Sequence, residues 1–283
     1  MSDIMERTIA SLPGFLTGSY GKSANISPGF QHLIHCIGDC KSKQEEEKIM
    51  KKEIEILKHR LLQTDINKRQ MREYLVRLIY CEMLGQDASF GYIHALKFVQ
   101  QGTLLDKRVG YLAVTLFLHE NHELIMLLIN TIQKDLQSTN IVEVCIALTV
   151  VCKLINTEMI PAILPLVEEK LQHPKAIVRT KAVMALYQFY RKAPNLVQHI
   201  HDKFRKSLCD KDPGVMSASL NIYYDLIKSN PDDYSDMVSS LVDVFQQVID
   251  KKLPSDYEYY RVPAPWLLIK LLKMMSVLGS DDE

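Results

Sequence analysis

Apolar residues recur every three to four positions along most of this chain. One run has its apolar residues at Val109, Leu112, Ala113, Leu116 and Phe117. That spacing places them on one face of an α-helix. The same period predicts helices over residues 41–63, 67–84, 104–119 and 123–136. No segment combines sustained alternation of apolar and polar residues with flanking hairpin turns, so we expect an all-α protein without a β-sheet.

Residues 1–29 differ from the rest of the chain. The stretch PGFLTGSYGKSANISPG at residues 13–29 is rich in small and polar residues, which is typical of a flexible loop. It contains Gly21-Lys22-Ser23, which is similar to the end of a phosphate-binding loop, but that loop also requires a glycine where Leu16 stands. We therefore expect an N-terminal segment at residues 1–29 and a helical domain at residues 30–283.

A repeated motif indicates how the helices are arranged. The segment from Leu171 to Val178 (LQHPKAIV) is followed 37 residues later by the segment from Leu208 to Val215 (LCDKDPGV). In each, a leucine ends one helix, a turn containing proline follows, and a valine begins the apolar face of the next helix. A helix pair repeated at this period predicts a HEAT-like or armadillo-like solenoid, in which each pair buries its apolar face against its neighbours.

The junction FLHENHELI at residues 117–125 contains two histidines and two glutamates between two predicted helices. Zinc-protease helices place their histidines four residues apart, whereas His119 and His122 are three apart. Helix capping and the helix dipole explain the same residues. Asn121 is a good N-cap, Glu123 suits the positive start of the second helix, and His119 suits the negative end of the first. We favour this interpretation and expect no metal site here.

The composition argues against several classes of function. Lys and Arg together number 34, as do Asp and Glu, so the formal net charge is zero and no general attraction to nucleic acid is expected. The six cysteines lie in apolar segments, and we expect them to be reduced core residues. Only Cys36 and Cys40 are closely spaced. Because no nucleophile elbow, phosphate loop or dinucleotide fingerprint is present, we expect no enzymatic activity, no catalytic residue and no cofactor.

Basic residues concentrate in the predicted helices at residues 41–63 and 67–84, where they are interleaved with glutamates. Two interpretations remain open: a solvated face rich in ion pairs, or a surface that contacts an acidic membrane or partner. The longest apolar runs, at residues 141–152 and 264–272, are shorter than the about 20 residues of a transmembrane helix. Any membrane contact is therefore expected to be peripheral.

Several stretches resemble the large subunits of clathrin-adaptor-type coat complexes. They are GFQHLIHCIGDCKSKQEEE (29–47), YCEMLGQDASFGYIHALKFV (80–99), DKRVGYLAVTLFL (106–118), KDLQSTN (134–140) and YEYYRVPAPWLLIKLL (257–272). The epsilon type of large subunit is the most similar, and the likeness covers almost the whole chain. The resemblance implies a helical-solenoid trunk, of which residues 30–283 would form the N-terminal half.

The resemblance also implies a function. It is that of a non-enzymatic subunit of a heterotetrameric adaptor coat complex, which sorts cargo and forms vesicles at the cytosolic face of the trans-Golgi network. The implied partners are a beta-type large adaptin, a mu-type medium subunit and a sigma-type small subunit. An Arf-family GTPase in its GTP state would recruit the complex to the membrane.

Two sets of binding residues follow from the same resemblance. Alignment with the gamma-type chain through FGYIHALK and INTIQKDL places an apolar GTPase-binding patch on Ile93, Leu96 and Leu127. The phosphoinositide-binding cluster of the alpha-type chain aligns with residues 68–71, where Lys68 and Arg69 are the membrane-facing basic residues. The arginine that helps the alpha-type chain bind dileucine signals is replaced by Gly38, so dileucine binding is not implied.

An armadillo-type solenoid that binds extended peptides in nuclear transport or signalling is the alternative function. That class usually lines its groove with regularly spaced Asn and Trp, and Trp266 is the only tryptophan in this chain. Co-purification with a sigma-type small subunit would separate the two functions.

Overall fold

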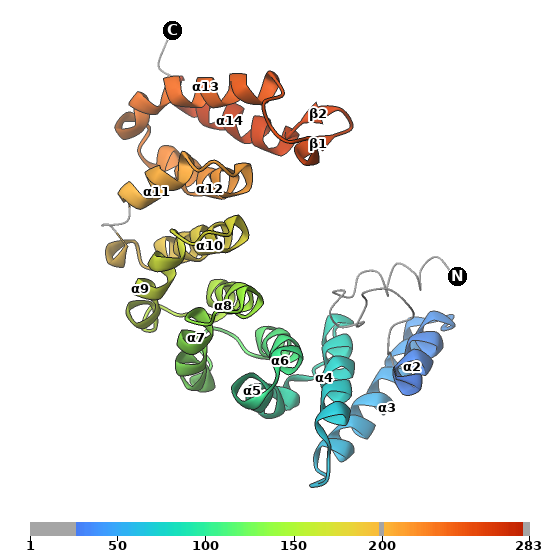
Figure 1. Ribbon diagram of the computed structural model, residues 1–283. Coiled ribbons are helices and arrows are strands. Elements are labelled where there is room, and N and C mark those ends of the chain that lie inside the picture. The colour runs from blue at the N-terminus through green and yellow to red at the C-terminus, as the bar shows by residue number, and fades with distance from the viewer. Residues whose placement is uncertain (1–26, 198–200, 280–283) are drawn as a thin grey trace. The chain divides into compact units, whose positions relative to one another are not determined.

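The computed structural model describes residues 27–197 and 201–279, and most of this part of the chain is helical (Figure 1). Nearly all of the predicted N-terminal segment, including Gly21-Lys22-Ser23, lies outside the described residues. The chain forms two compact units, Met1–Asp135 with Lys153–Ile155, and Leu136–Cys152 with Asn156–Glu283. Each is a stack of short helices, as the repeat predicts.

Side-chain caps begin the first three helices of unit 1. Its elements are α2 (Pro28–Gly38), α3 (Lys43–Leu61), α4 (Lys68–Met83), the 3₁₀ helix η1 (Ser89–Gly91), α5 (Tyr92–Gln101), α6 (Leu104–Phe117), the 3₁₀ helix η2 (Glu123–Leu128) and α7 (Ile129–Leu136), which ends at the boundary between the units. Ser27, Ser42 and Asn67 each accept a hydrogen bond from a backbone N–H of the first turn of α2, α3 and α4. The helices predicted at residues 41–63 and 67–84 are confirmed to within two residues at each end.

The core of unit 1 is built where the predicted apolar faces meet. The rings of Phe30 on α2 and Tyr80 on α4 pack edge to face, with centroids 5.4 Å apart. α5 lies close against α6 because Gly110 has no side chain: a Cβ there would lie 3.0 Å from the Ala95 carbonyl oxygen and from Val99. The close helix pair α5–α6 carries one of the candidate surfaces described below.

Ion pairs with a buried carboxylate connect helices of unit 1. Glu53 on α3 and Arg77 on α4 are both buried and lie 2.5 Å apart. Arg72 donates to Asp106 at 2.6 Å, and Asp135 accepts from Lys107 and from the Tyr111 hydroxyl. The interpretation of the basic helices as a solvated, ion-paired face is therefore wrong for the Glu53–Arg77 pair, which lies inside.

The repeat seen in the sequence recurs as a packing pattern in unit 2. Its elements are α8 (Ile141–Leu154), α9 (Ile160–Lys170), α10 (Ala176–Lys192), η3 (Pro194–Leu196), α11 (His201–Leu208), α12 (Pro213–Ser229), η5 (Pro231–Met237), α13 (Val238–Ile249), η6 (Ser255–Tyr257), β1 (Glu258–Tyr259), β2 (Val262–Pro263) and α14 (Pro265–Leu278). Val178 on α10 and Val215 on α12 occupy equivalent positions and are both buried. α12 packs on α10 and α14 on α12, so each helix pair covers the next (Figure 1).

The expectation of no β-sheet is wrong at one place in unit 2. Strands β1 and β2 form an antiparallel pair with Tyr259 opposite Val262. Tyr260 and Arg261, which connect the strands, have φ values of 48° and 66°, in the left-handed region. Strands of two residues are too short to show alternation, and this turn lacks the Asn or Gly that normally marks a tight hairpin.

Candidate partner-binding surfaces

The N-terminal part of α5 presents an apolar residue to solvent. Its buried face is formed by Ala95, Leu96, Phe98 and Val99, and Ile93 lies on the opposite side, where 46% of its surface is exposed. Lys97 and Gln100 follow Ile93 at four and seven residues, so the three share one exposed stripe of the helix.

Helix η2 adds two further exposed apolar residues beside this stripe. Met126 and Leu127 are 53% and 55% exposed. The side-chain amide of Gln100 donates to the Leu127 carbonyl oxygen at 3.4 Å, which joins η2 to α5. We call the exposed residues Ile93, Met126 and Leu127, with Lys97 and Gln100, the α5–η2 surface.

The electrostatics of the α5–η2 surface are simple. Burial lowers the pKa of His94, and the neighbouring Lys97 lowers it further. His94 is therefore neutral at pH 7, and Lys97 supplies the positive charge of α5 here. An apolar surface with one flanking cation suits a partner with an apolar face and an acidic edge.

Leu96 does not belong to the α5–η2 surface. Only 6% of it is exposed, so its side chain is part of the core and is not available to a partner. The resemblance to the gamma-type chain places Leu96 in the patch together with Ile93 and Leu127, but the phase of α5 turns Leu96 inward. Met126, which the alignment did not place in the patch, is exposed as well. Residues 123–128 form a 3₁₀ helix whose buried residues, Ile125 and Leu128, are three positions apart, so Met126 and Leu127 both remain exposed.

The turn between α3 and α4 carries the two basic residues implied to face a membrane. Lys68 and Arg69 are exposed in the first turn of α4. Cations are unfavourable at this positive helix end by about 0.3–1 kcal/mol each, so helix stability does not explain them. Leu62, which follows α3, is 80% exposed on the same turn. The α3–α4 turn therefore presents one large apolar side chain and two cations to solvent.

The histidine-containing corner at residues 117–125 is a helix end, as predicted, but its cap differs from the prediction. Helix α6 ends at Phe117, so His119 lies beyond it, and His122 rather than Asn121 caps η2 by accepting from the Leu124 N–H. The His122 ring also packs against Tyr92 of α5, with centroids 5.6 Å apart. Glu123 lies in the first turn of η2, as predicted.

No group of histidine, cysteine and carboxylate side chains in the described part of the chain is arranged to hold a metal ion. The cysteines with described surroundings are free thiols. Cys81 is buried, as expected of a core residue, whereas Cys209 is exposed, contrary to the expectation. Burial raises the pKa of Cys81 to about 12 and that of Cys152 to about 11, so neither supplies a thiolate at pH 7.

Comparisons with known proteins agree with the fold. The profile of the adaptin N-terminal region matches residues 46–283. The chain is 57% identical to "AP-4 complex subunit epsilon-1" of Mus musculus over 100% of the chain and 26% of that protein. It is 53% identical to "AP-4 complex subunit epsilon" of Arabidopsis thaliana over 94% of the chain and 28% of that protein. The chain therefore spans about a quarter of the length of these relatives.

A comparison with solved structures also finds an adaptor-complex chain. A chain of a homology model of the full-length AP-3 complex in an intermediate open conformation matches 75% of this chain with a TM-score of 0.58 and 26% identity, over 35% of that chain. Within residues 27–197 and 201–279, every helix is too short or too polar to cross a bilayer. The family match over residues 46–283 extends over both units.

Proposed function

Because the chain belongs to the adaptin family, with AP-4 epsilon subunits among its relatives, we propose that it is a non-enzymatic subunit of a heterotetrameric adaptor coat complex. In this role it assembles with a beta-type large adaptin, a mu-type medium subunit and a sigma-type small subunit. The complex sorts cargo at the cytosolic face of the trans-Golgi network. The similarity over the full length of the chain is the observation that carries the proposal.

We further propose that the α5–η2 surface binds an Arf-family GTPase in its GTP state. Ile93, Met126 and Leu127 are large apolar side chains that remain exposed on adjacent elements. Grouped exposed apolar side chains mark interaction sites, and such anchors typically contribute about 2 kcal/mol or more each to an interface. The resemblance to the gamma-type chain supports the same position through Ile93 and Leu127.

Binding of a GTP-loaded Arf protein to charge-carrying variants tests this site. Ile93→Asp and Leu127→Asp should each weaken binding at least tenfold, since about 1.4 kcal/mol corresponds to a factor of ten. Ile177→Asp is a matched control, because Ile177 is equally exposed but lies in unit 2. Unchanged binding by well-folded Ile93→Asp and Leu127→Asp proteins, or an equal loss in the control, would exclude the α5–η2 surface.

The α3–α4 turn is proposed as the peripheral membrane contact. Lys68 and Arg69 would meet anionic headgroups, at about 1 kcal/mol for each basic residue near the surface, and Leu62 would enter the interfacial region. Reversal of both charges (Lys68→Glu with Arg69→Glu) should therefore reduce sedimentation with phosphatidylserine vesicles at least tenfold.

Two exposed lysines of α3 supply the matched control for the vesicle experiment. Lys51→Glu with Lys52→Glu makes the same change of net charge away from the turn. The membrane proposal requires this control to bind vesicles more tightly than the Lys68/Arg69 variant. Equal binding by the two double variants would show that only the total charge matters.

A further inference from the structure

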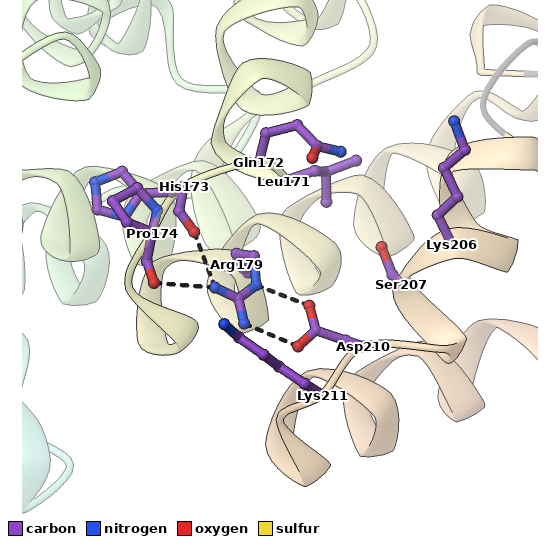
Figure 2. Close-up of a pocket in the computed structure, with 9 residues that line it drawn as sticks. All are labelled: Leu171, Gln172, His173, Pro174, Arg179, Lys206, Ser207, Asp210 and Lys211. Carbon is purple, nitrogen blue, oxygen red and sulfur yellow. Dashed lines mark hydrogen bonds and ion pairs between the residues drawn. The ribbon is translucent and has the colours of Figure 1, made fainter.

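A pocket of about 510 Å³ opens in unit 2 between two successive helix corners (Figure 2). The α9–α10 corner contributes His173 and Pro174 to its lining, and the first turn of α10 contributes Arg179. Lys206, near the end of α11, and Lys211, in the α11–α12 corner, lie on different sides of the pocket (Figure 2). Its volume falls in the range of about 300–1,000 Å³ that is typical of sites for small ligands.

Arg179 forms part of the wall of this pocket and has little capacity left for a ligand. Its Nε and Nη2 atoms donate to the two carboxylate oxygens of Asp210 at 2.7 and 2.8 Å. Its Nη1 atom donates to the carbonyl oxygens of His173 and Pro174 at 2.9 and 3.2 Å. Arg179 therefore connects the two corners and fixes the shape of the pocket, and its charge is balanced by Asp210.

The two lysines of the pocket are less tightly paired, although Lys211 lies near enough to Asp210 to help lower its pKa. Lys206 and Lys211 are exposed, and neither forms a hydrogen bond or an ion pair with another described residue. Asp212 also acts on Arg179. The three cations Arg179, Lys206 and Lys211 therefore face two carboxylates, Asp210 and Asp212, and the pocket keeps a net charge of about +1.

We propose that this pocket binds a short acidic peptide segment of a partner protein. A single phosphate group would require cations that converge on one point. In Figure 2 the end of Lys211 lies beside Arg179, whereas Lys206 points away on the other side of Asp210. An extended peptide can present carboxylates at two separate places to two separate ammonium groups. The proposal uses unit 2 alone and does not rest on Arf recruitment or membrane contact.

Fluorescence anisotropy with a labelled peptide that carries two Glu-Glu pairs, using the full 283-residue chain, tests the proposal. We expect binding that weakens as salt rises from about 50 to about 300 mM, because exposed charges are screened. The same peptide with Gln in place of Glu should not bind. The double variant Lys206→Glu with Lys211→Glu should lose at least tenfold in affinity, and Lys206→Arg with Lys211→Arg should keep it.

A control at two other exposed lysines of unit 2 separates the pocket from general electrostatics. Lys228→Glu with Lys273→Glu changes the net charge equally and should bind the peptide as the unchanged chain does. Equal weakening in this control, or unchanged binding by a Lys206/Lys211 double-Glu variant with a normal melting curve, would overturn the proposal. Inorganic phosphate that binds the pocket while the peptide does not would overturn the peptide assignment.

Discussion

At the scale of single residues, Ile93, Leu96 and Leu127 have different roles although their side chains are nearly the same size. Ile93 and Leu127 face solvent, and Leu96 is buried between α5 and its neighbours. Apolar character alone does not separate these roles, because both the core and a partner-binding surface require it. The distinction comes from the helical phase, because each step of one residue turns the side chain by about 100° around the helix axis.

Aspartate substitutions measure this difference directly. Leu96→Asp places a charge in the core and should cost several kcal/mol, since an isolated buried charge is strongly unfavourable. Ile93→Asp is a surface change and should alter the free energy of unfolding by about 0.5 kcal/mol or less. Thermal unfolding followed by circular dichroism provides the comparison. A Leu96→Asp protein as stable as Ile93→Asp would show that the phase of α5 is wrong.

Gly110 offers a second test at this scale. Gly110→Ala adds a Cβ within 3.0 Å of backbone and side-chain atoms of α5, so we expect it to destabilise the protein by about 1–3 kcal/mol despite the better helix propensity of alanine. Gly29→Ala in α2 is the control, because its Cβ would meet only Glu73 and Arg77 side-chain atoms at 3.7 Å or more. Denaturant unfolding in which Gly110→Ala equals or exceeds the native stability would contradict close α5–α6 packing.

At the scale of helices, a buried ion pair joins α3 and α4, the two basic helices for which the sequence suggested either a solvated face or a surface that contacts a membrane or partner. The Glu53–Arg77 pair is buried between α3 and α4. Removing one partner leaves the other charge uncompensated, so Arg77→Met should cost about 3–5 kcal/mol. The double variant Glu53→Leu with Arg77→Met should recover most of this loss, because an apolar pair can replace a buried ion pair. Urea unfolding of both proteins checks this, and a double variant less stable than the single one would refute it.

The carboxylates that connect helices should make the stability of the protein depend on pH in the acidic range. Burial favours the neutral form of Asp106, but hydrogen bonds from Thr103 and Arg72 outweigh it and lower the pKa. The hydrogen bonds from Arg179 lower the pKa of Asp210 despite some desolvation. A carboxylate whose pKa is lower in the folded state than in the unfolded state stabilises the fold. This stabilisation is complete at pH values above the unfolded-state pKa of about 3.9, and it is lost as the pH falls through the folded-state pKa.

The corresponding measurement is the free energy of unfolding between about pH 6 and pH 3. It should decrease toward low pH, and Asp106→Asn should make the decrease shallower because one of the titrating groups is removed. Asp232→Asn, at an exposed carboxylate in η5, is the control and should leave the slope unchanged. A slope that Asp106→Asn does not alter would show that this carboxylate does not stabilise the fold through its charge.

Helix positions were predictable from the sequence, and connections between helices were less so. The apolar period located α3 and α4 to within two residues, because a helix of 16 or 19 residues repeats its pattern several times. Residues 123–136 form a 3₁₀ helix followed by α7, and the period alone cannot reveal that change. The β1–β2 hairpin was missed because two-residue strands carry no pattern.

At the scale of the whole molecule, the sequence identified the adaptin family and the helical-repeat fold, and the comparisons confirmed both. The candidate binding residues were less predictable. Alignment indicated Ile93 and Leu127, but it could not show that Leu96 is buried or that Met126 is exposed, since both facts depend on tertiary packing. The basic pocket at Lys206 and Lys211 was also missed, because it is formed by two corners that are separated by more than 30 residues.

Assembly with the other adaptor subunits tests the proposed coat function most directly. The 283-residue chain should be co-expressed with a sigma-type small subunit of the same type of complex and analysed by size-exclusion chromatography with light scattering. The proposed function predicts a stable one-to-one complex that survives purification, and Ile93→Asp should leave it intact because the α5–η2 surface is assigned to the GTPase. A well-folded chain that elutes separately from the small subunit would contradict the assignment as an adaptor-complex subunit.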